Sequence, residues 1–411
     1  MGAVTTPSVR DGLSLLREPR FARLFAARLV SAFGTAMAPI ALPFAVLEDL
    51  GGDASDVGVV IALGSAAQVA MQLFAGALAD RGSRRRQMVR ADLLAASAQA
   101  AIAALLWTGR ATVPSVAALH ALAGVALALH FPAAVGLVPL AVARERIQLA
   151  NAWLAIAQAT AFGLGAAAGG LVVATAGAGA ALALDAATFA TSAALVAGIR
   201  SASQPRAEAA SLLRDLRDGW REFTAHTWLW AIVLQFTVML MAWFGAWAVL
   251  GPIVAKQSLG GAASWGWIAS AQGLGLVFGG AVGLRVRFAR PMRAATLACL
   301  PSALVPLLLV PPAPVAWIAA AACAAGVGFE IFSVQWNTAL HTRVDPAALS
   351  RVSSYDVLGS IALVPVGEVL AGWGAEAIGA PATLAAACAG IVLPTLAVLC
   401  VREVWSLPAK G

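Results

Sequence analysis

Charged residues are scarce in this chain. Only 11% of its 411 residues are charged, whereas 61% are hydrophobic. A soluble domain of this size carries about 25% charged residues, so the composition excludes an ordinary soluble protein. Apolar stretches long enough to cross a bilayer recur along almost the whole chain, which is typical of a membrane protein with many spans.

Other absences narrow the class of protein that this sequence can encode. Lipid cannot satisfy the backbone of an open sheet, and the alternating pattern of an outer-membrane barrel is missing. The four cysteines lie in apolar stretches without metal-ligand spacing. No phosphate-binding loop, dinucleotide fingerprint or Ser/His/Asp arrangement stands out. The sequence therefore predicts an all-α membrane protein that is not an enzyme and uses neither a cofactor nor a metal.

The charge that is present is mostly basic, with a net value of +7. In a soluble protein this would suggest a nucleic-acid partner. Here the arginines lie in short loops, so we interpret them as topology signals and expect no nucleic acid. An inside N-terminus leaves only Arg110 and Lys256 in outward-facing loops, which predicts cytoplasmic N- and C-termini.

The apolar stretches predict twelve transmembrane helices. The polar segment 200–227 contains Leu212, Leu216, Trp220 and Phe223 at helical spacing, which predicts a linker ending in an amphipathic helix on the inner leaflet. It separates an N-terminal six-helix half (1–199) from a C-terminal one (228–411). The expected spans are 21–48, 56–80, 87–108, 113–141, 147–174, 179–199, 228–255, 263–284, 293–310, 315–340, 350–373 and 380–401.

Three stretches carry a family resemblance. They are the loop from Gly76 to Arg86 (Gly-Ala-Leu-Ala-Asp-Arg-Gly-Ser-Arg-Arg-Arg), the stretch from Asp185 to Ser192, and the stretch from Val344 to Asp356. With the twelve-span layout, they resemble the major facilitator superfamily over nearly the full length. The branch that they resemble most is the third drug:proton antiporter family, which includes macrolide-efflux and enterobactin-exporter-like proteins.

The resemblance implies a conformational latch at the loop. In the family, the residue at Gly76 lets span 2 pack on span 11, and Asp80 faces the positive N-terminal end of span 11. Arg84 pairs with Asp80, and the latch closes the cytoplasmic side in the outward-open state. The alternative is that the arginines only retain the loop inside. The full expected latch is Gly76, Asp80, Arg81, Arg84, Arg85, Asp92 and Asp356.

Span 5 carries a small-residue stretch that resembles the family's antiporter motif. It contains Gly163, Gly165, Gly169 and Gly170, with Ala166 where the motif has proline. Either an antiport-specific hinge or plain helix packing explains these glycines. Span 4 contains His120 and His130 but lacks the arginine that many proton-coupled antiporters carry there.

Three acids inside the spans are candidates for proton coupling: Glu330, Asp185 and Glu368. An acid in mid-bilayer costs about 2.5–3.5 kcal/mol, so such groups usually face a cavity or a partner. Glu330 has no basic residue within one helical turn. It is expected to be the coupling site, the counter-charge for a cationic substrate, or a structural acid. Arg28, inside span 1, is expected to extend toward the membrane surface.

An aromatic face on span 7 predicts a substrate cavity. Trp243 and Trp247 are four residues apart and share a helix face. With Phe236, they suit a hydrophobic or cationic ligand, or else serve as packing bulk. The other candidate cavity residues are Gln68, Gln158, Gln235, Gln272, Trp336 and Asn337.

The sequence as a whole predicts a secondary transporter of a bacterial cytoplasmic membrane. We expect export of a small hydrophobic or amphipathic compound, in exchange for protons, by rocker-switch alternating access. The expected partners are this small-molecule substrate, protons and the lipid bilayer, with the chain as a monomer. The alternatives are a metabolite uptake permease and a lipid translocator without tight proton coupling.

Overall fold

A computed structural model describes residues 14–199, 220–286, 288–345 and 348–406. Within these ranges the side chains of a few residues are not described, among them Gly76, Asp80 and Arg81. The part of the latch predicted on these three residues, and most of the predicted linker, therefore lie outside the described part of the chain.

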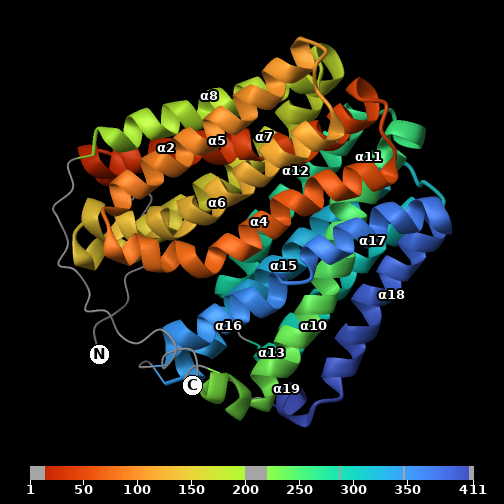
Figure 1. Cartoon of the computed structure of the whole chain (residues 1–411). Coiled ribbons are helices and arrows are strands. Elements are labelled where there is room, and N and C mark those ends of the chain that lie inside the picture. The colour runs from red at the N-terminus through yellow and green to blue at the C-terminus, as the bar shows by residue number, and fades with distance from the viewer. Residues whose placement is uncertain (1–13, 200–219, 287, 346–347, 407–411) are drawn as a thin grey trace.

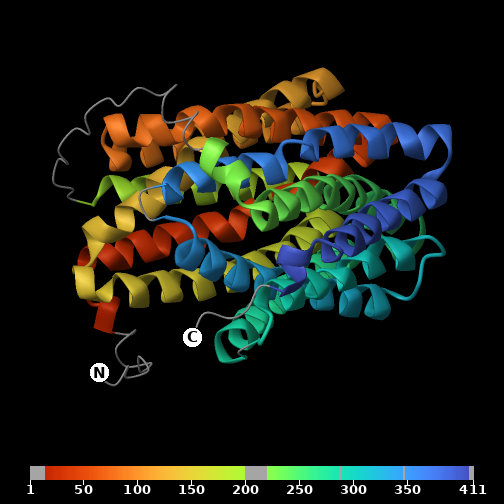
Figure 2. The ribbon, with the colours of Figure 1, turned by 90° about the horizontal axis from the view of Figure 1, so that it is seen from below.

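Helices make up every described element, and the long ones run roughly along one axis (Figure 2). The first half contains α2 (Pro19–Thr35), α3 (Ala38–Phe44), η1 (Ala45–Asp49), α4 (Ala54–Arg81), α5 (Arg84–Trp107), α6 (Val113–Ala141), η2 (Arg144–Arg146), α7 (Ile147–Ala176) and α8 (Ala178–Ala197). The second half contains α10 (Thr227–Phe244), η3 (Gly245–Leu250), α11 (Gly251–Val254), η4 (Ala255–Leu259), α12 (Ala262–Arg285), α13 (Pro291–Ala298), η5 (Leu300–Ala303), α14 (Leu304–Leu309), α15 (Val315–Arg343), α16 (Leu349–Ile361), α17 (Val364–Ala377), α18 (Ala380–Leu399) and α19 (Arg402–Ser406).

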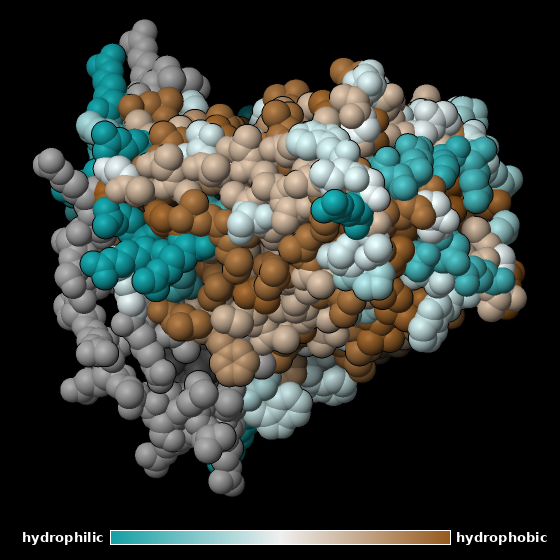
Figure 3. Space-filling model, turned by 45° about the horizontal axis from the view of Figure 1, so that its top comes forward, coloured by the Kyte–Doolittle hydropathy of each residue, from teal (hydrophilic) through white to brown (hydrophobic). Residues whose placement is uncertain are grey.

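The described helices confirm an all-α membrane protein. Eleven of them, some interrupted, are long and apolar enough to cross a membrane. The predicted span 263–284 is not among the eleven, but it coincides with the single helix α12. Figure 3 shows hydrophobic side chains over the middle of one face, with hydrophilic ones gathered toward its two ends. The total of twelve spans stays a prediction.

Local sequence explains where helices begin. Asp53 caps α4, because its carboxylate accepts the backbone N–H of Asp56 at 3.0 Å and the Ser55 hydroxyl at 2.9 Å. The backbone N–H of Asp56 and the Ser55 hydroxyl together hold the pKa of Asp53 below its ordinary value. The turns into α8 and α18 use Gly177 and Gly379, whose φ angles of +83° and +88° favour glycine.

Proline interrupts three predicted spans. Span 1 is divided around α3, which contains Pro39 and Pro43, and span 9 is divided at η5, which contains Pro301. Span 11 is divided between α16 and α17, where Pro365 lies in the first turn of α17. Proline has no N–H and clashes with the carbonyl four residues back, so the helix ladder breaks there.

The two halves converge at one end of the bundle. We call this the far end; α4 begins there and α7 ends there. At the opposite near end, α2 begins and α19 lies (Figure 1). Figure 1 shows α4 beside α17 toward the far end, whereas α4 and α16 diverge toward the near end.

Candidate functional site

Glycine backbones join the two halves at the far end. A Cβ atom added to Gly170 of α7 would lie 2.6 Å from the carbonyl oxygen of Ala262 in α12. One added to Gly58 of α4 would lie 2.7 Å from the carbonyl oxygen of Glu368 in α17. Real side chains do not fit at these distances, so glycine is what allows each pair of helices to touch.

Three hydrogen bonds also cross between the halves at this end. The Ser65 hydroxyl donates to Oε1 of Glu368 at 3.1 Å. The backbone N–H of Ser55 donates to Oε1 of Glu376 at 2.8 Å. The Lys256 ammonium donates to the carbonyl oxygen of Leu47 at 2.6 Å. The far end is therefore closed by backbone contacts and by polar groups of both halves.

The glycines of the antiporter-like motif all lie at helix contacts. Gly163 and Gly170 face α12, while Gly165 and Gly169 face the first span. A Cβ atom on Gly165 would lie 2.1 Å from the carbonyl oxygen of Phe33. Close packing accounts for these positions, and an antiport-specific hinge stays a prediction.

A cavity of about 990 Å³ lies between the halves on the near-end side of these contacts. Its lining comes from α2, α6, α7 and α8 of the first half and from α12 and α15 of the second. The cavity is lined by the beginning of α7 and the last part of α12. The far-end contacts are made by the end of α7 and the beginning of α12. Of the predicted site residues, Gln158 and Glu330 line it.

Glu330 faces this cavity from the second half. Its side chain is half-buried. It lies against Gly279, where an added Cβ atom would be 2.9 Å from the Cβ of Glu330. Within the described ranges the Glu330 carboxylate has no hydrogen-bond or ion-pair partner. It is thus available to a proton or to a bound molecule.

Arg28 faces the same cavity from the first half. We expected Arg28 to extend toward the membrane surface, but this prediction was wrong. The side chain is only 7% exposed, and its Nη2 atom donates to Oε1 of Gln158 at 2.8 Å. Its Nε atom is buried and has no partner among the described groups.

Asp92 holds a cavity histidine in place. It is fully buried, and its Oδ1 atom lies 2.6 Å from Nδ1 of His130, which lines the cavity. Its Oδ2 atom accepts the Ser192 hydroxyl at 2.7 Å. Both partners lie outside the arginine loop, whereas we expected Asp92 to join the latch there.

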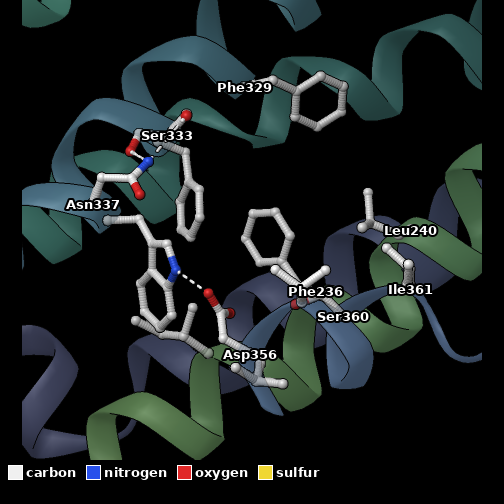
Figure 4. Close-up of a pocket in the computed structure, with 13 residues that line it drawn as sticks. Phe236, Leu240, Phe329, Ser333, Asn337, Asp356, Ser360 and Ile361 are labelled. Atoms are coloured by element: carbon white, nitrogen blue, oxygen red, sulfur yellow. Dashed lines mark hydrogen bonds between the residues drawn. The ribbon is translucent and has the colours of Figure 1, made fainter. Parts of the chain in front are cut away.

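The described arginines of that loop also bind within the first half. Nη1 of Arg84 donates to the carbonyl oxygen of Gly136 at 2.9 Å, and Nη1 of Arg85 donates to that of Ala197 at 2.9 Å. The last latch candidate, Asp356, accepts Nε1–H of Trp336 at 2.8 Å within the second half (Figure 4).

A smaller cavity of about 330 Å³ lies between α10, α15 and α16. Phe236, Trp336 and Asn337, all predicted cavity residues, line it. Figure 4 shows the ring of Phe236 extending from α10 and that of Phe329 from α15, and the amide of Asn337 turned toward Ser333 of its own helix. The lining is mainly aromatic and apolar.

The remaining predicted cavity residues lie outside the linings of both cavities. Trp243 is 3% exposed and stacks on Trp247, with ring centroids 5.0 Å apart. Gln235 is buried, and its amide donates to Thr395 of α18 at 3.1 Å. Gln68 and Gln272 line neither cavity. These contacts favour the packing interpretation of the tryptophan pair.

Asp185 also has local partners. It is fully buried, and its Oδ2 atom accepts the amide of Gln99 in α5 at 2.9 Å. Glu368, 1% exposed, accepts the Ser65 hydroxyl across the far-end contact, while its Oε2 atom has no partner among the described groups. The described residues contain no cluster of histidine, cysteine or acid that could hold a metal.

The family follows from a comparison of the sequence. A family model described as Major Facilitator Superfamily matches residues 24–360. The chain belongs to the major facilitator superfamily. It is therefore a multi-pass membrane transporter of small molecules and not an enzyme. No curated protein matches it.

Solved structures share the fold at low identity. A mutant of the nucleoside transporter NupG is similar with a TM-score of 0.77 and 14% identity, over 93% of this chain and 100% of that one. A mutant of the peptide transporter POT has a TM-score of 0.75 and 14% identity, with 95% of each chain covered. A POT family transporter in complex with 5-aminolevulinic acid has a TM-score of 0.71 and 13% identity, over 92% and 95%.

The sequence analysis missed Arg28 as a cavity residue. Hydropathy gives the depth of an arginine in a span, but it does not give the face on which that arginine lies. The signal was present, because an arginine well inside an apolar run usually has a polar neighbour or a cavity.

Proposed function

We propose that this transporter exports a small hydrophobic or amphipathic compound in exchange for protons, across a bacterial cytoplasmic membrane. The observation that carries the proposal is the cavity of about 990 Å³ built by both halves beside a closed far end. In alternating access, two halves rock around such a site. The distribution of basic residues favours a cytoplasmic near end, and a cavity on that side suits the loading step of an exporter.

Glu330 is the proposed coupling residue. A cavity-facing carboxylate without a described partner can take up a proton and release it when a substrate enters. Asp185 and Glu368 remain secondary candidates, because each already accepts a hydrogen bond from a neighbouring helix.

The loop from Gly76 to Arg86 is the proposed latch for the opposite state. Its action requires the near ends of span 2 and span 11 to meet. Toward the near end α4 and α16 diverge (Figure 1), so the state described here is one in which the latch would be released.

Twelve spans, cytoplasmic termini, two six-helix halves and a monomer belong to the same proposal.

Lipid translocation is the second candidate. Two residues of the cavity lining, Phe131 and Ile156, are 58% and 59% exposed. Such exposure suits a cavity that also opens sideways toward lipid. Uptake of a metabolite remains the third candidate, and it differs in both direction and substrate class.

An efflux measurement in a bacterium lacking its own exporters tests the proposal. Accumulation of a panel of dyes and antibiotics is compared for wild type, Glu330→Gln and the control Glu145→Gln, an exposed acid near the start of α7. We expect wild type and control to lower accumulation and Glu330→Gln to fail. Equal activity of Glu330→Gln would remove the coupling assignment, and inactivity of all three would contradict export of these compounds.

A further inference from the structure

We propose that the transported compound carries a carboxylate, which Arg28 binds inside the large cavity with the amide of Gln158 beside it. This inference rests on the proposed function and adds a substrate class to it. The exported molecule is then an amphipathic monocarboxylate with an apolar body, rather than a neutral or cationic drug.

The first argument is the unbalanced charge of Arg28. Its guanidinium is only 7% exposed, and its described hydrogen-bond partner is the neutral amide of Gln158. The described part of the chain places no acid within ion-pair distance of it. A buried cation is costly unless an anion accompanies it, so the position is suited to an anion that arrives with the substrate.

The second argument is that Arg28 and Gln158 keep unused hydrogen-bond donors. A guanidinium has donors only, so Gln158 must turn its oxygen toward Arg28, which leaves its –NH₂ group free. Both side chains line the cavity, and the described hydrogen bond of Arg28 uses only its Nη2 atom, so the guanidinium keeps unused donors; its Nε atom is unpaired but itself buried. Two adjacent donor groups, one of them a planar fork, match the two oxygens of a carboxylate.

The other charged groups of the lining restrict the ligand to one acidic group. Arg285 lies exposed at the last turn of α12 and adds positive charge. Glu330, on the opposite half, disfavours a second negative charge by like-charge repulsion. His130 is already paired with Asp92, which lies behind it.

The rest of the lining suits an apolar body. Phe131, Phe162 and Phe189 contribute rings, and Leu276 and Val277 contribute aliphatic surface. A volume of about 990 Å³ lies at the upper end of the usual range for small-molecule sites. A carboxylate attached to an aromatic or alkyl chain meets both the polar and the apolar parts of this cavity.

Thermal unfolding of the detergent-purified full chain tests the proposal without a proton gradient. The probes are two matched series: phenylbutyrate, phenylbutyramide and phenylbutylamine, and decanoate, decanamide and decylamine. Within each series only the head group changes. We expect the carboxylates to raise the melting temperature of the wild type at lower concentration than the amides or amines.

Substitutions locate the effect. Arg28→Gln should weaken carboxylate binding about ten- to a hundredfold, the loss of a charge-assisted hydrogen bond, and should leave amide binding unchanged. Arg28→Lys keeps the charge and should recover part of the affinity. The control is Arg23→Gln, because Arg23 lies on the same helix and binds the carbonyl oxygen of Gly198. If Arg28→Gln does not fold, Arg28→Lys and Gln158→Ala supply the comparison.

Several results overturn the inference. They are equal binding of carboxylate and amide by the wild type, absence of binding in both series, and unchanged carboxylate binding in Arg28→Gln. Failure of proton-driven export would leave these binding results intact. Export of neutral compounds with no preference for carboxylates would support the proposed function but contradict carboxylate binding by Arg28.

Discussion

Replacing Gly170 with alanine is expected to separate the two halves at the far end. The added Cβ atom would lie 2.6 Å from the carbonyl oxygen of Ala262 and 2.8 Å from the Cα atom of Gly266. Both are backbone atoms of α12, so no side chain can rotate away. The two helices must move apart, and only the state with a closed far end is penalised.

The size of the effect follows from the contact. An extra carbon forced into close packing costs about 1–3 kcal/mol. A penalty of this size on one of two states changes their ratio by roughly 5- to 150-fold. Alanine also stabilises a helix interior by up to about 1 kcal/mol relative to glycine, but it does so in both states, so this term cancels.

Gly163→Ala is the matched control. Gly163 lies on the same helix and faces the same partner, yet the nearest atom to its added Cβ would be 3.5 Å away, an ordinary contact. The helix propensity changes equally in the two variants. Only the clash differs, so Gly163→Ala should behave as the wild type does.

The assay is a distance measurement between spin labels at the far end. Labels are placed at the exposed positions Thr175 and Ser258, one in each half, after replacement of the four native cysteines. Gly170→Ala should move the distance distribution toward longer values, with Gly163→Ala unchanged. An unaltered distribution for Gly170→Ala, or an equal change in both variants, would refute the role of the glycine contact.

Three further predictions follow from other regions. Asp80→Asn should sharply reduce transport while membrane insertion stays intact, and wild-type rates at equal expression would contradict the latch. Trp243→Ala should lower stability by about 3–5 kcal/mol, because a buried ring stacked on Trp247 is lost; a changed substrate range at unchanged melting temperature would instead restore its assignment to the cavity. The depressed pKa of Asp53 means that its contribution to stability is present above the unfolded-state pKa and is lost as the pH falls through the folded-state value. Asp53→Ala should therefore melt below wild type at neutral pH and together with it in strong acid, and a gap that persists in acid would exclude this ionised cap.

Much of the helical layout could be predicted from hydropathy. The span expected at 263–284 is observed as α12, from Ala262 to Arg285. Its limits are legible in the sequence because glycines precede it and an arginine ends it. A long apolar run bounded by such residues has few alternatives in a bilayer.

Interruptions of the spans could not be predicted in the same way. Pro365 begins a new helix, whereas Pro394 remains inside the continuous helix α18. Whether a proline breaks a helix depends on what satisfies the freed carbonyl, and this is decided by neighbouring helices rather than by the local sequence.

The candidate functional site could likewise be predicted only in part. The sequence analysis selected Glu330 and Gln158, and both line the large cavity. It did not pair Gln158 with Arg28, because 130 residues separate them along the chain. Likewise, Asp92 was assigned to the loop beside it in the sequence, whereas the fold brings it to His130 and Ser192. Proximity across helices is a property of packing, which one sequence does not contain.

The glycine contact at the far end also bears on how temperature affects transport. Glycine has no side-chain rotamers, so bringing Gly58 and Gly170 against their partner helices orders almost nothing beyond the backbone, which is already helical. The glycine contacts therefore add little conformational entropy to closure, in contrast to the side chains of Lys256 and Glu376 that bond across the same end. Where the open and closed forms are equally populated, the enthalpy of closure equals its entropy multiplied by the temperature, so the glycine contacts by themselves should make the ratio of the two forms only weakly dependent on temperature. A strong temperature dependence of the transport cycle would then arise from the side chains that bond across the far end, from the near end or from the lipid.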